Sequence, residues 1–234
     1  MDWLKKYGIA LFLIIILFHC IAIFLEWSAI RFYSKLLIIP FLILLMSLNM
    51  RGGVGLSSLK LLPLIALTAS FMGDLFLSFT DAQFFLWGML SFIITHICNS
   101  IYFFKLNPLR LKRLKYATIS SLILAIICSL IVYTIKDSLG TFFIPIMVYM
   151  VIIGSMTVLA SNLLANDLYA HLALQYFIPG AALFVMSDGI LALNKFSLKE
   201  PLFDVIVMLT YGLAQLYLVM GFYKTHEMSM QSEK

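Results

Sequence analysis

Two acidic residues lie deep inside apolar stretches of this sequence, where ionisable side chains are rare. Asp74 follows Gly73 in the segment Gly-Asp-Leu-Phe-Leu, and Asp188 follows Ser187 in the segment Ser-Asp-Gly-Ile-Leu. Two carboxyl groups that share a cavity of low dielectric constant do not easily both ionise. Such a pair can supply one acid and one base at neutral pH, which is the chemistry needed for proton transfer during hydrolysis.

A simpler role for each acid is to hold helices together. A carboxyl group can hydrogen-bond to a neighbouring helix, and the small residues Gly73 and Ser187 would let two helices come close. An ionisable group inside a membrane is costly, however, and normally marks a site or a pathway. Because two such acids occur, we take Asp74 and Asp188 as the candidate catalytic residues.

One stripe of the segment 84–104 combines glycine, aromatic and polar residues at helical spacing. Its members, three or four residues apart, are Gly88, Phe92, His96, Asn99 and Phe103. Residues at this spacing share one face of a helix. A face of this composition suits a polar interior better than lipid, so His96 and Asn99 are candidates for contacts to a substrate.

Further polar residues inside apolar segments could bind a substrate or orient the acids. Lys35 could contact an anionic head group or one of the acids, or it could extend to the membrane surface. Tyr211 and Gln215 are one helical turn apart and form a second polar face. The complete set of candidate substrate-binding residues is Lys35, His96, Asn99, Tyr149, Ser187, Tyr211 and Gln215.

The sequence lacks the usual motifs for a cofactor. Its four histidines are scattered, with no His-x-x-x-His pair, and Cys20, Cys98 and Cys128 have no paired spacing. These patterns argue against a zinc site and against a disulfide framework. There is also no glycine-rich phosphate loop and no Gly-x-Ser-x-Gly motif. We therefore expect no cofactor and no metal.

The elements that hold these residues must be membrane-spanning helices. Hydrophobic residues make up 63% of the 234 residues and charged residues only 12%, and the mean hydropathy is +1.04. A soluble domain needs about twice that share of charge. A net charge of +5 could indicate nucleic-acid binding, but in a membrane protein basic loops set the orientation of the helices. We therefore expect no nucleic-acid partner.

Eight apolar segments are separated by short polar or turn-forming loops. Each is long enough for a membrane-spanning helix, and the predicted helices cover residues 7–25, 33–49, 59–79, 84–104, 116–135, 142–163, 171–193 and 203–223. The sequence thus predicts an all-α bundle of eight transmembrane helices. The whole chain, residues 1–234, is expected to form a single transmembrane domain without a separate aqueous part.

The alternation of the helices predicts that the two acids lie at one depth. The helices 59–79 and 171–193 run in the same direction across the membrane. Each aspartate lies about five residues past its helix midpoint, which is ~7 to 8 Å toward the outer face at ~1.5 Å per residue. The two carboxyl groups can therefore meet in one cavity.

Several segments together resemble the YhhN-like family of membrane proteins, whose animal members are lysoplasmalogenases. The matching positions are Gly73-Asp74-Leu-Phe-Leu, then Gly88, Phe92, His96 and Tyr102, then Gly180 to Ala192 with Phe196, and finally Tyr211-Gly-Leu-Ala214-Gln215. The resemblance runs from Lys35 to Gln215. It implies an eight-helix bundle with Asp74 and Asp188 as catalytic candidates. We expect the protein to lie in the cell's inner (plasma) membrane.

The substrate that the resemblance implies is a lysophospholipid within the bilayer. It is a lysoplasmalogen, either 1-alkenyl-glycerophosphoethanolamine or the choline form, whose vinyl ether bond is hydrolysed to a fatty aldehyde and a glycerophospho-alcohol. Protonation of the outer alkene carbon leaves an oxocarbenium ion, and water then adds. This reaction needs one carboxylic acid and one carboxylate, and it needs no metal or nucleotide.

A second class of function is compatible with the same two acids. Asp74 and Asp188 could carry protons or cations in a small coupled membrane transporter. Transporters often contain internal repeats, and the two aspartate segments, 114 residues apart, hint at two four-helix halves. A purely structural or lipid-binding protein is the third possibility.

The distribution of basic residues predicts that both termini are cytoplasmic. Eleven of the sixteen lysine and arginine residues fall on the side of the N-terminus and the other five on the opposite side, and basic loops remain in the cytoplasm. A reporter that is active only outside the cytoplasm, fused after Lys234, should therefore be silent. A strong signal from this fusion would mean that a helix was miscounted.

Overall fold

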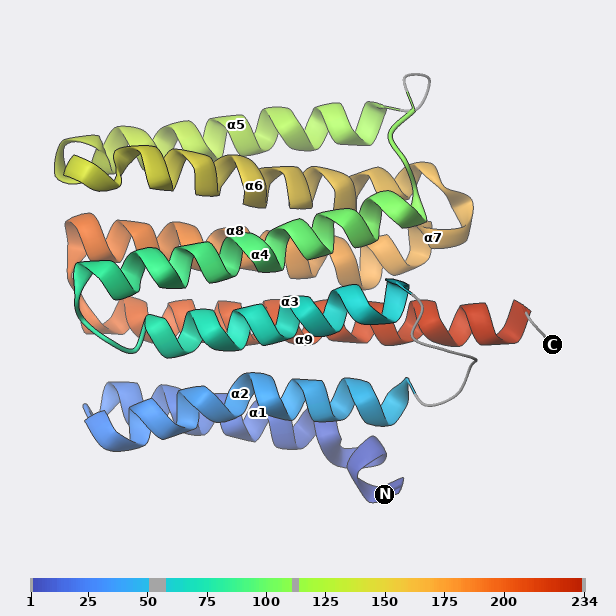
Figure 1. The fold of residues 1–234 in the computed structure, drawn as a ribbon, viewed down its shortest axis with the longest axis horizontal. Helices are drawn as coiled ribbons and strands as arrows, with labels where there is room; N and C mark the ends of the chain where they lie inside the picture. The colour runs from blue at the N-terminus through green and yellow to red at the C-terminus, as the bar shows by residue number, and fades with distance from the viewer. Residues whose placement is uncertain (1, 51–57, 111–113, 233–234) are drawn as a thin grey trace.

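A computed structural model of the chain describes residues 2–50, 58–110 and 114–232, and no strand is present in these ranges. Figure 1 shows long helices lying side by side, with successive spans running in opposite directions. The α-helices are α1 (Asp2–Phe24), α2 (Ser28–Asn49), α3 (Ser58–Phe76), α4 (Ala82–Leu106), α5 (Lys115–Ile135), α6 (Phe143–Asn162), α7 (Asp167–Leu172), α8 (Ile178–Leu193) and α9 (Pro201–Ser232).

Eight spans among the described residues are long and apolar enough to cross a membrane. The all-α fold with eight membrane-spanning helices, predicted from composition and segment length, is therefore confirmed. Helices suit this environment because they satisfy their own backbone hydrogen bonds where lipid offers no water to replace them. The protein is a multi-pass membrane protein.

The seventh span is not one regular α-helix. It starts earlier than the predicted helix 171–193, with α7, where the Asn166 side chain accepts a hydrogen bond from the Leu168 amide at 3.1 Å and caps the helix. The π-helical segment Ala173–Phe177 joins α7 to α8, and a second one, Asn194–Leu198, follows α8. Segments of π-helix within α-helices are frequent at functional sites.

Several other helix ends differ from the predicted bounds. α1 starts at Asp2 instead of 7 and α2 at Ser28 instead of 33. α3 stops at Phe76 instead of 79, because the backbone enters a turn at Leu77. α9 continues past 223 to Ser232, because the polar residues that follow include neither proline nor glycine to break the helix. The predicted end at 223 was the end of the apolar segment, whereas the helix continues through the polar residues to Ser232.

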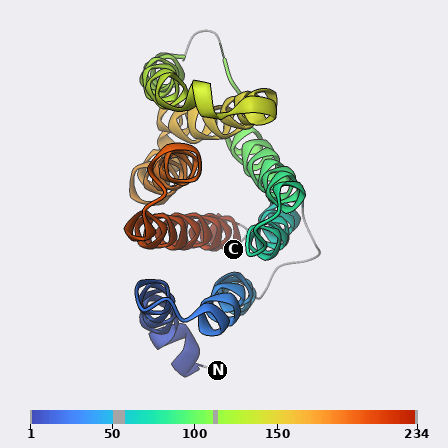
Figure 2. The ribbon, with the colours of Figure 1, turned by 90° about the vertical axis from the view of Figure 1, so that its left-hand side faces the viewer.

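Four helices form the centre of the bundle. Figure 2 shows α1 and α2 paired on one side and α5 and α6 on the opposite side, with α3, α4, α8 and α9 between them. In this central layer α3 packs on α4 and α8 packs on α9. Asp74 belongs to α3 and Asp188 to α8, so the two acids come from the two central pairs.

α1 begins and α9 ends at the same end of the bundle (Figure 1). An even number of spans requires this arrangement. The assignment of that end to the cytoplasm stays a prediction. Four of the basic residues that were counted for it, Arg51, Lys112, Arg113 and Lys234, lie outside the described residues.

Glycine lets α3 and α4 approach closely beside Asp74. A methyl group on Gly73 would lie 2.6 Å from the Phe92 ring, and one on Gly88 would lie 2.7 Å from Leu77. Small residues at such crossings allow helix backbones to come close inside a membrane. The two glycines thus set the distance at which Asp74 faces α4.

Replacing Gly73 with alanine should destabilise the protein, because the Phe92 ring must move to admit the methyl group. We expect a loss of about 1–3 kcal/mol, seen as a lower midpoint of thermal unfolding in detergent. Gly154 is the matched control, since a methyl group there meets no neighbour within 4 Å and alanine favours the helix. Equal midpoints for the two variants would contradict the close approach.

Candidate active site

A polar cavity of about 350 Å³ lies at the end of the bundle opposite the chain termini. Both Asp74 and Asp188 line it. Its walls come from α2, α3, α4, α8 and α9, and its charged and polar lining residues are Arg31, Lys35, Asp74, Thr80, Ser187, Asp188, Asn194, Lys195, Asp204 and Tyr211. The structure therefore brings the two acids, from helices far apart in the sequence, to one space.

Asp74 is held by a different partner on each oxygen. Its Oδ2 accepts a hydrogen bond from the Tyr211 hydroxyl at 2.7 Å, and its Oδ1 lies 3.6 Å from the Lys35 ammonium nitrogen. The side chain of Asp74 is only 4% exposed. A hydroxyl donor and a cation both favour the ionised form of a carboxyl group, so this environment suits a carboxylate.

Asp188 has a different environment, formed by α4 and α6. Its Oδ2 accepts a hydrogen bond of 2.5 Å from the Tyr149 hydroxyl. The Nε2 of His96 lies 3.6 Å from the same oxygen and 3.0 Å from the Tyr149 oxygen. Asp188, Tyr149 and His96 thus form one compact group, and no basic side chain other than the imidazole is paired with Asp188 within the described ranges.

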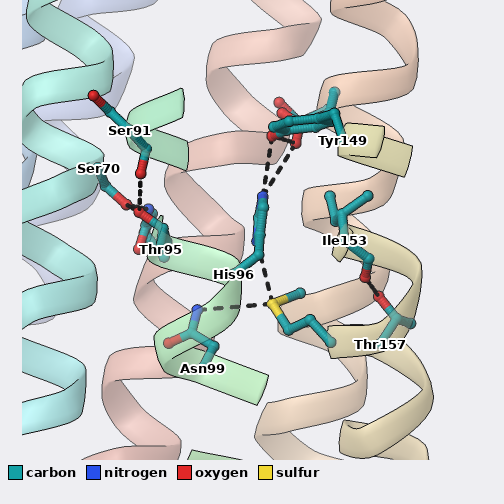
Figure 3. A network of polar contacts seen from close by, with 12 residues as sticks. Ser70, Ser91, Thr95, His96, Asn99, Tyr149, Ile153 and Thr157 are labelled. Atoms are coloured by element: carbon teal, nitrogen blue, oxygen red, sulfur yellow. Dashed lines mark hydrogen bonds and ion pairs between the residues drawn. The ribbon is translucent and has the colours of Figure 1, made fainter. Parts of the chain in front are cut away.

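The other ring nitrogen of His96 faces a sulfur atom. Its Nδ1 lies 3.3 Å from the Sδ of Met156, and the Asn99 amide also donates to this sulfur at 3.7 Å. Figure 3 shows His96 between Tyr149 and the Asn99 side of the network. A thioether can only accept a hydrogen bond, so its position indicates that Nδ1 carries a hydrogen.

A second polar network lies behind the cavity and joins α3, α4 and α9. The Gln215 amide donates to the Ser70 hydroxyl at 2.9 Å, and this hydroxyl lies 3.0 Å from that of Thr95. Thr95 in turn donates to the Ala66 carbonyl at 3.0 Å. Because Gln215 is one helical turn from Tyr211, this network holds the helix that presents Tyr211 to Asp74.

The residues predicted to form the site fall into three groups. Asp74, Asp188, Lys35, Ser187 and Tyr211 line the polar cavity. Tyr149 lines an adjoining apolar cavity. The remaining three, His96, Asn99 and Gln215, are at most 2% exposed and lie behind the cavity walls.

Ser187 reaches the cavity but is already engaged. Its hydroxyl donates a hydrogen bond of 3.1 Å to the Val207 carbonyl. It therefore ties α8 to α9 next to Asp188, and any contact that it makes to a ligand would come from its remaining acceptor capacity.

Five charged or polar residues of the cavity were not predicted from the sequence, namely Arg31, Thr80, Asn194, Lys195 and Asp204. Arg31 pairs with Asp204 at 2.8 Å, and the Asn194 amide donates to the other oxygen of Asp204 at 2.8 Å. The Lys195 ammonium lies 4.4 Å from the centre of the Phe85 ring. Helical spacing could have found two of them, because Arg31 is one turn before Lys35 and Asp204 is two turns before Tyr211.

A small apolar cavity of about 60 Å³ adjoins the polar one. The two cavities share Asp188 and four apolar residues, Leu77, Phe85, Phe92 and Leu191. Asp188 thus lies where a polar space meets an apolar one. A molecule with a polar head and an apolar chain could place the bond between these two parts next to this carboxyl group.

The protein can be related to known families over most of its length. A sequence model of the YhhN family matches residues 30–222, a range that contains every residue of the polar cavity. The chain belongs to the YhhN family. Among the described residues, no group of three or more histidine, cysteine, aspartate or glutamate side chains is placed to hold a metal ion.

Two curated relatives carry the same name. The chain is 30% identical over 165 residues to lysoplasmalogenase TMEM86A of Bos taurus, and 30% identical over 166 residues to lysoplasmalogenase TMEM86A of Homo sapiens. Each match covers 70% of this chain and 65% of the relative. The YhhN-family chain therefore spans just under two thirds of these relatives. No solved structure is significantly similar to it.

Proposed function

We propose that this protein is a membrane-embedded lysoplasmalogenase, which hydrolyses the vinyl ether bond of a lysoplasmalogen to a fatty aldehyde and a glycerophospho-alcohol. The observation that carries the proposal is the meeting of Asp74 and Asp188 in one cavity that is polar on one side and apolar on the other. The names of the two mammalian relatives support the class of substrate.

In the first step, Asp188 acts as the acid. It borders the apolar cavity, where the alkene of the substrate would lie beside the hydrocarbon chain. Transfer of its proton to the outer alkene carbon leaves an oxocarbenium ion, whose positive charge is stabilised by the two carboxylates then present. Preorganised charges aimed at a developing charge are an effective source of catalysis in a site that excludes water.

In the second step, Asp74 acts as the base. Its contacts with Lys35 and Tyr211 favour the carboxylate form, and in this role it removes a proton from the water that adds to the oxocarbenium carbon. The resulting hemiacetal collapses when its hydroxyl proton passes to Asp188 and the glycerol oxygen leaves with the proton from Asp74. One water is consumed, and both carboxyl groups return to their starting states.

Tyr149 and His96 position Asp188. The Tyr149 hydroxyl lies 2.5 Å from Oδ2 of Asp188 and 3.0 Å from the Nε2 of His96. It therefore links the imidazole to the carboxyl group and fixes the direction in which Asp188 faces the cavity.

The charges around the polar cavity suit a phosphodiester. Three basic residues line it, Arg31, Lys35 and Lys195, and so do three acidic residues, Asp74, Asp188 and Asp204. When all three acids are ionised, the net charge of these six side chains is zero. When one of the two candidate catalytic acids is protonated, the net charge is +1. This charge opposes the one negative charge of a phosphodiester, in either the ethanolamine or the choline substrate.

A cation-coupled transporter is supported less well by the same cavity. Arg31, Lys35 and Lys195 line the space that a cation would have to cross, and they would repel it. Asp74, which such a transporter would use to bind the cation, is already paired with Lys35.

The decisive experiment measures aldehyde release from a lysoplasmalogen by the purified protein in detergent, with the saturated-ether analogue as the unreactive control. Asp74→Asn and Asp188→Asn should each lower the rate by about 100-fold or more, because an amide can neither donate nor accept the proton. Asp137→Asn, on the loop after α5, is the matched control and should react normally. Near-normal activity in either site variant would remove that residue from the mechanism.

The same assay tests the absence of a metal from the proposed chemistry. A chelator should leave the rate unchanged. Loss of activity that added metal restores would mean that Asp74 and Asp188 act as ligands instead.

Replacing Tyr149 with phenylalanine should slow the reaction without weakening substrate binding. Without the hydroxyl bridge between His96 and Asp188, kcat should fall by about 10-fold or more, while KM stays nearly constant. Tyr33→Phe removes a hydroxyl from a residue that is 68% exposed on α2 and lines neither cavity, and it should have no effect. A higher KM with unchanged kcat would instead assign Tyr149 to substrate binding alone.

A further inference from the structure

Beyond the candidate active site, a mostly apolar groove of about 920 Å³ lies along α5 and α6, with Lys136 at one end. These two helices form one edge of the bundle (Figure 2). Two of the groove's lining residues, Cys128 and Met150, also line the apolar cavity. That cavity in turn shares Asp188 with the polar cavity. The groove, the apolar cavity and the polar cavity therefore lie next to one another in series.

We propose that the groove and the apolar cavity bind the hydrocarbon chain of a single-chain lysophospholipid, which enters from the bilayer between α5 and α6 and passes Cys128 and Met150 to reach Asp188. The proposal rests on the proposed function, because it assigns the chain of that substrate to this path. It also assigns the head group to the polar cavity at the other side of Asp188.

The walls of the groove are suited to a hydrocarbon chain. The hydroxyl groups of Ser121 and Ser155, which line it, donate to carbonyl oxygens of their own helices at 2.8 Å and 2.7 Å. They therefore need no polar partner from a ligand. Gly154 leaves further space, since a methyl group there would meet no neighbour within 4 Å.

α5 is the most loosely packed of the described spans. Only 11% of its apolar window is buried, the smallest share among them. Near the end of α5, Ile135 packs in a buried cluster with Phe85, Leu139 and Ile146, and the groove extends along the helix from Lys136 to Ser121. A chain that starts at Asp188 and runs along the groove toward Ser121 points to the middle of the membrane.

This direction matches the depth at which a lysophospholipid lies in a bilayer. Its phosphate remains at the polar end of the bundle, next to Arg31 and Lys195, and its chain points toward the hydrocarbon core. The substrate can then enter the site without leaving the depth it occupies in the membrane.

The apolar cavity has room for one chain. A volume of about 60 Å³ holds about four to six groups the size of a water molecule, and a methylene group is of similar size. The first few carbons beyond the alkene would fill the cavity, and the rest of the chain would lie in the groove. A second chain has no space beside the first inside this cavity.

Narrowing the passage should harm long chains more than short ones. We expect Cys128→Phe to lower kcat/KM by about 10-fold or more for a vinyl ether with a chain of about sixteen carbons, relative to one of about four carbons that ends inside the cavity. Ile126→Phe adds the same ring at a residue 62% exposed to lipid that lines neither space, and should leave the ratio unchanged. Equal losses for both substrates would overturn the proposal.

A binding measurement tests the path without any turnover. Cys20 and Cys98 are buried whereas Cys128 is partly exposed, so Cys128 can be alkylated by a thiol reagent and followed by mass spectrometry. A long-chain saturated-ether lysophospholipid, which cannot be hydrolysed, should slow this alkylation by about 10-fold at about ten times its Kd. In the double variant Cys128→Ser, Ile126→Cys, the thiol at the lipid-facing position should not be protected.

The two measurements separate this proposal from the proposed function. Protection of Cys128 alone supports the path even if the protein releases no aldehyde, in which case the proposed function fails. Aldehyde release without protection of Cys128, or with equal protection at both positions, overturns the path and leaves the proposed function intact.

Discussion

A carboxyl group buried between membrane-spanning helices needs donors, and lipid provides none. Asp74 therefore takes its partners from α9 and α2, through Tyr211 and Lys35, and Asp188 takes its partners from α6 and α4, through Tyr149 and His96. With α3 and α8, which carry the acids themselves, six of the spans are joined at one level. The requirement to satisfy two acids thus organises the centre of the bundle, and α1 and α5 are left to the periphery.

The two acids differ in what surrounds them rather than in their own chemistry. A cation and a hydroxyl donor flank Asp74, which stabilises a carboxylate. Asp188 instead has a tyrosine and a neighbouring imidazole on one side and an apolar space on the other. Opposite environments around two like groups are the usual way to obtain an acid and a base at one pH, and here the difference is made by residues from four other helices.

The periphery meets a different demand, because its side chains face hydrocarbon. α5 shows this most clearly, with Leu122, Ile126 and Leu130 each more than 60% exposed. In a soluble protein such a face would be an interaction surface or an aggregation hazard, whereas in a bilayer it is ordinary. A loosely packed apolar helix beside the site is also the place where a lipid chain can pass at small energetic cost, since no polar group has to be exposed.

The sequence by itself determined the number of spans and the level of the site. Long apolar runs can only be helices in lipid, and helix alternation with a constant rise per residue places Asp74 and Asp188 at one depth. The polar residues worth attention, including Lys35, His96 and Tyr211, followed from the rarity of such side chains in apolar segments. None of this depends on how one helix is rotated or placed beside another.

The tertiary structure alone decided which residues pair and what the cavity contains. Tyr211 is 137 residues from Asp74 and Tyr149 is 39 residues from Asp188, and no local pattern states that these helices are neighbours. Arg31 and Asp204 were missed because they lie near helix ends, where charged residues are common in membrane proteins and do not stand out in the sequence. Only the folded chain shows that they line a cavity. The apolar space beside Asp188 is formed by side chains of several helices, so it exists only once these helices are packed. The physical reason is that contacts between helices set the lateral position and the rotation of each helix. The sequence of a single helix does not determine either one.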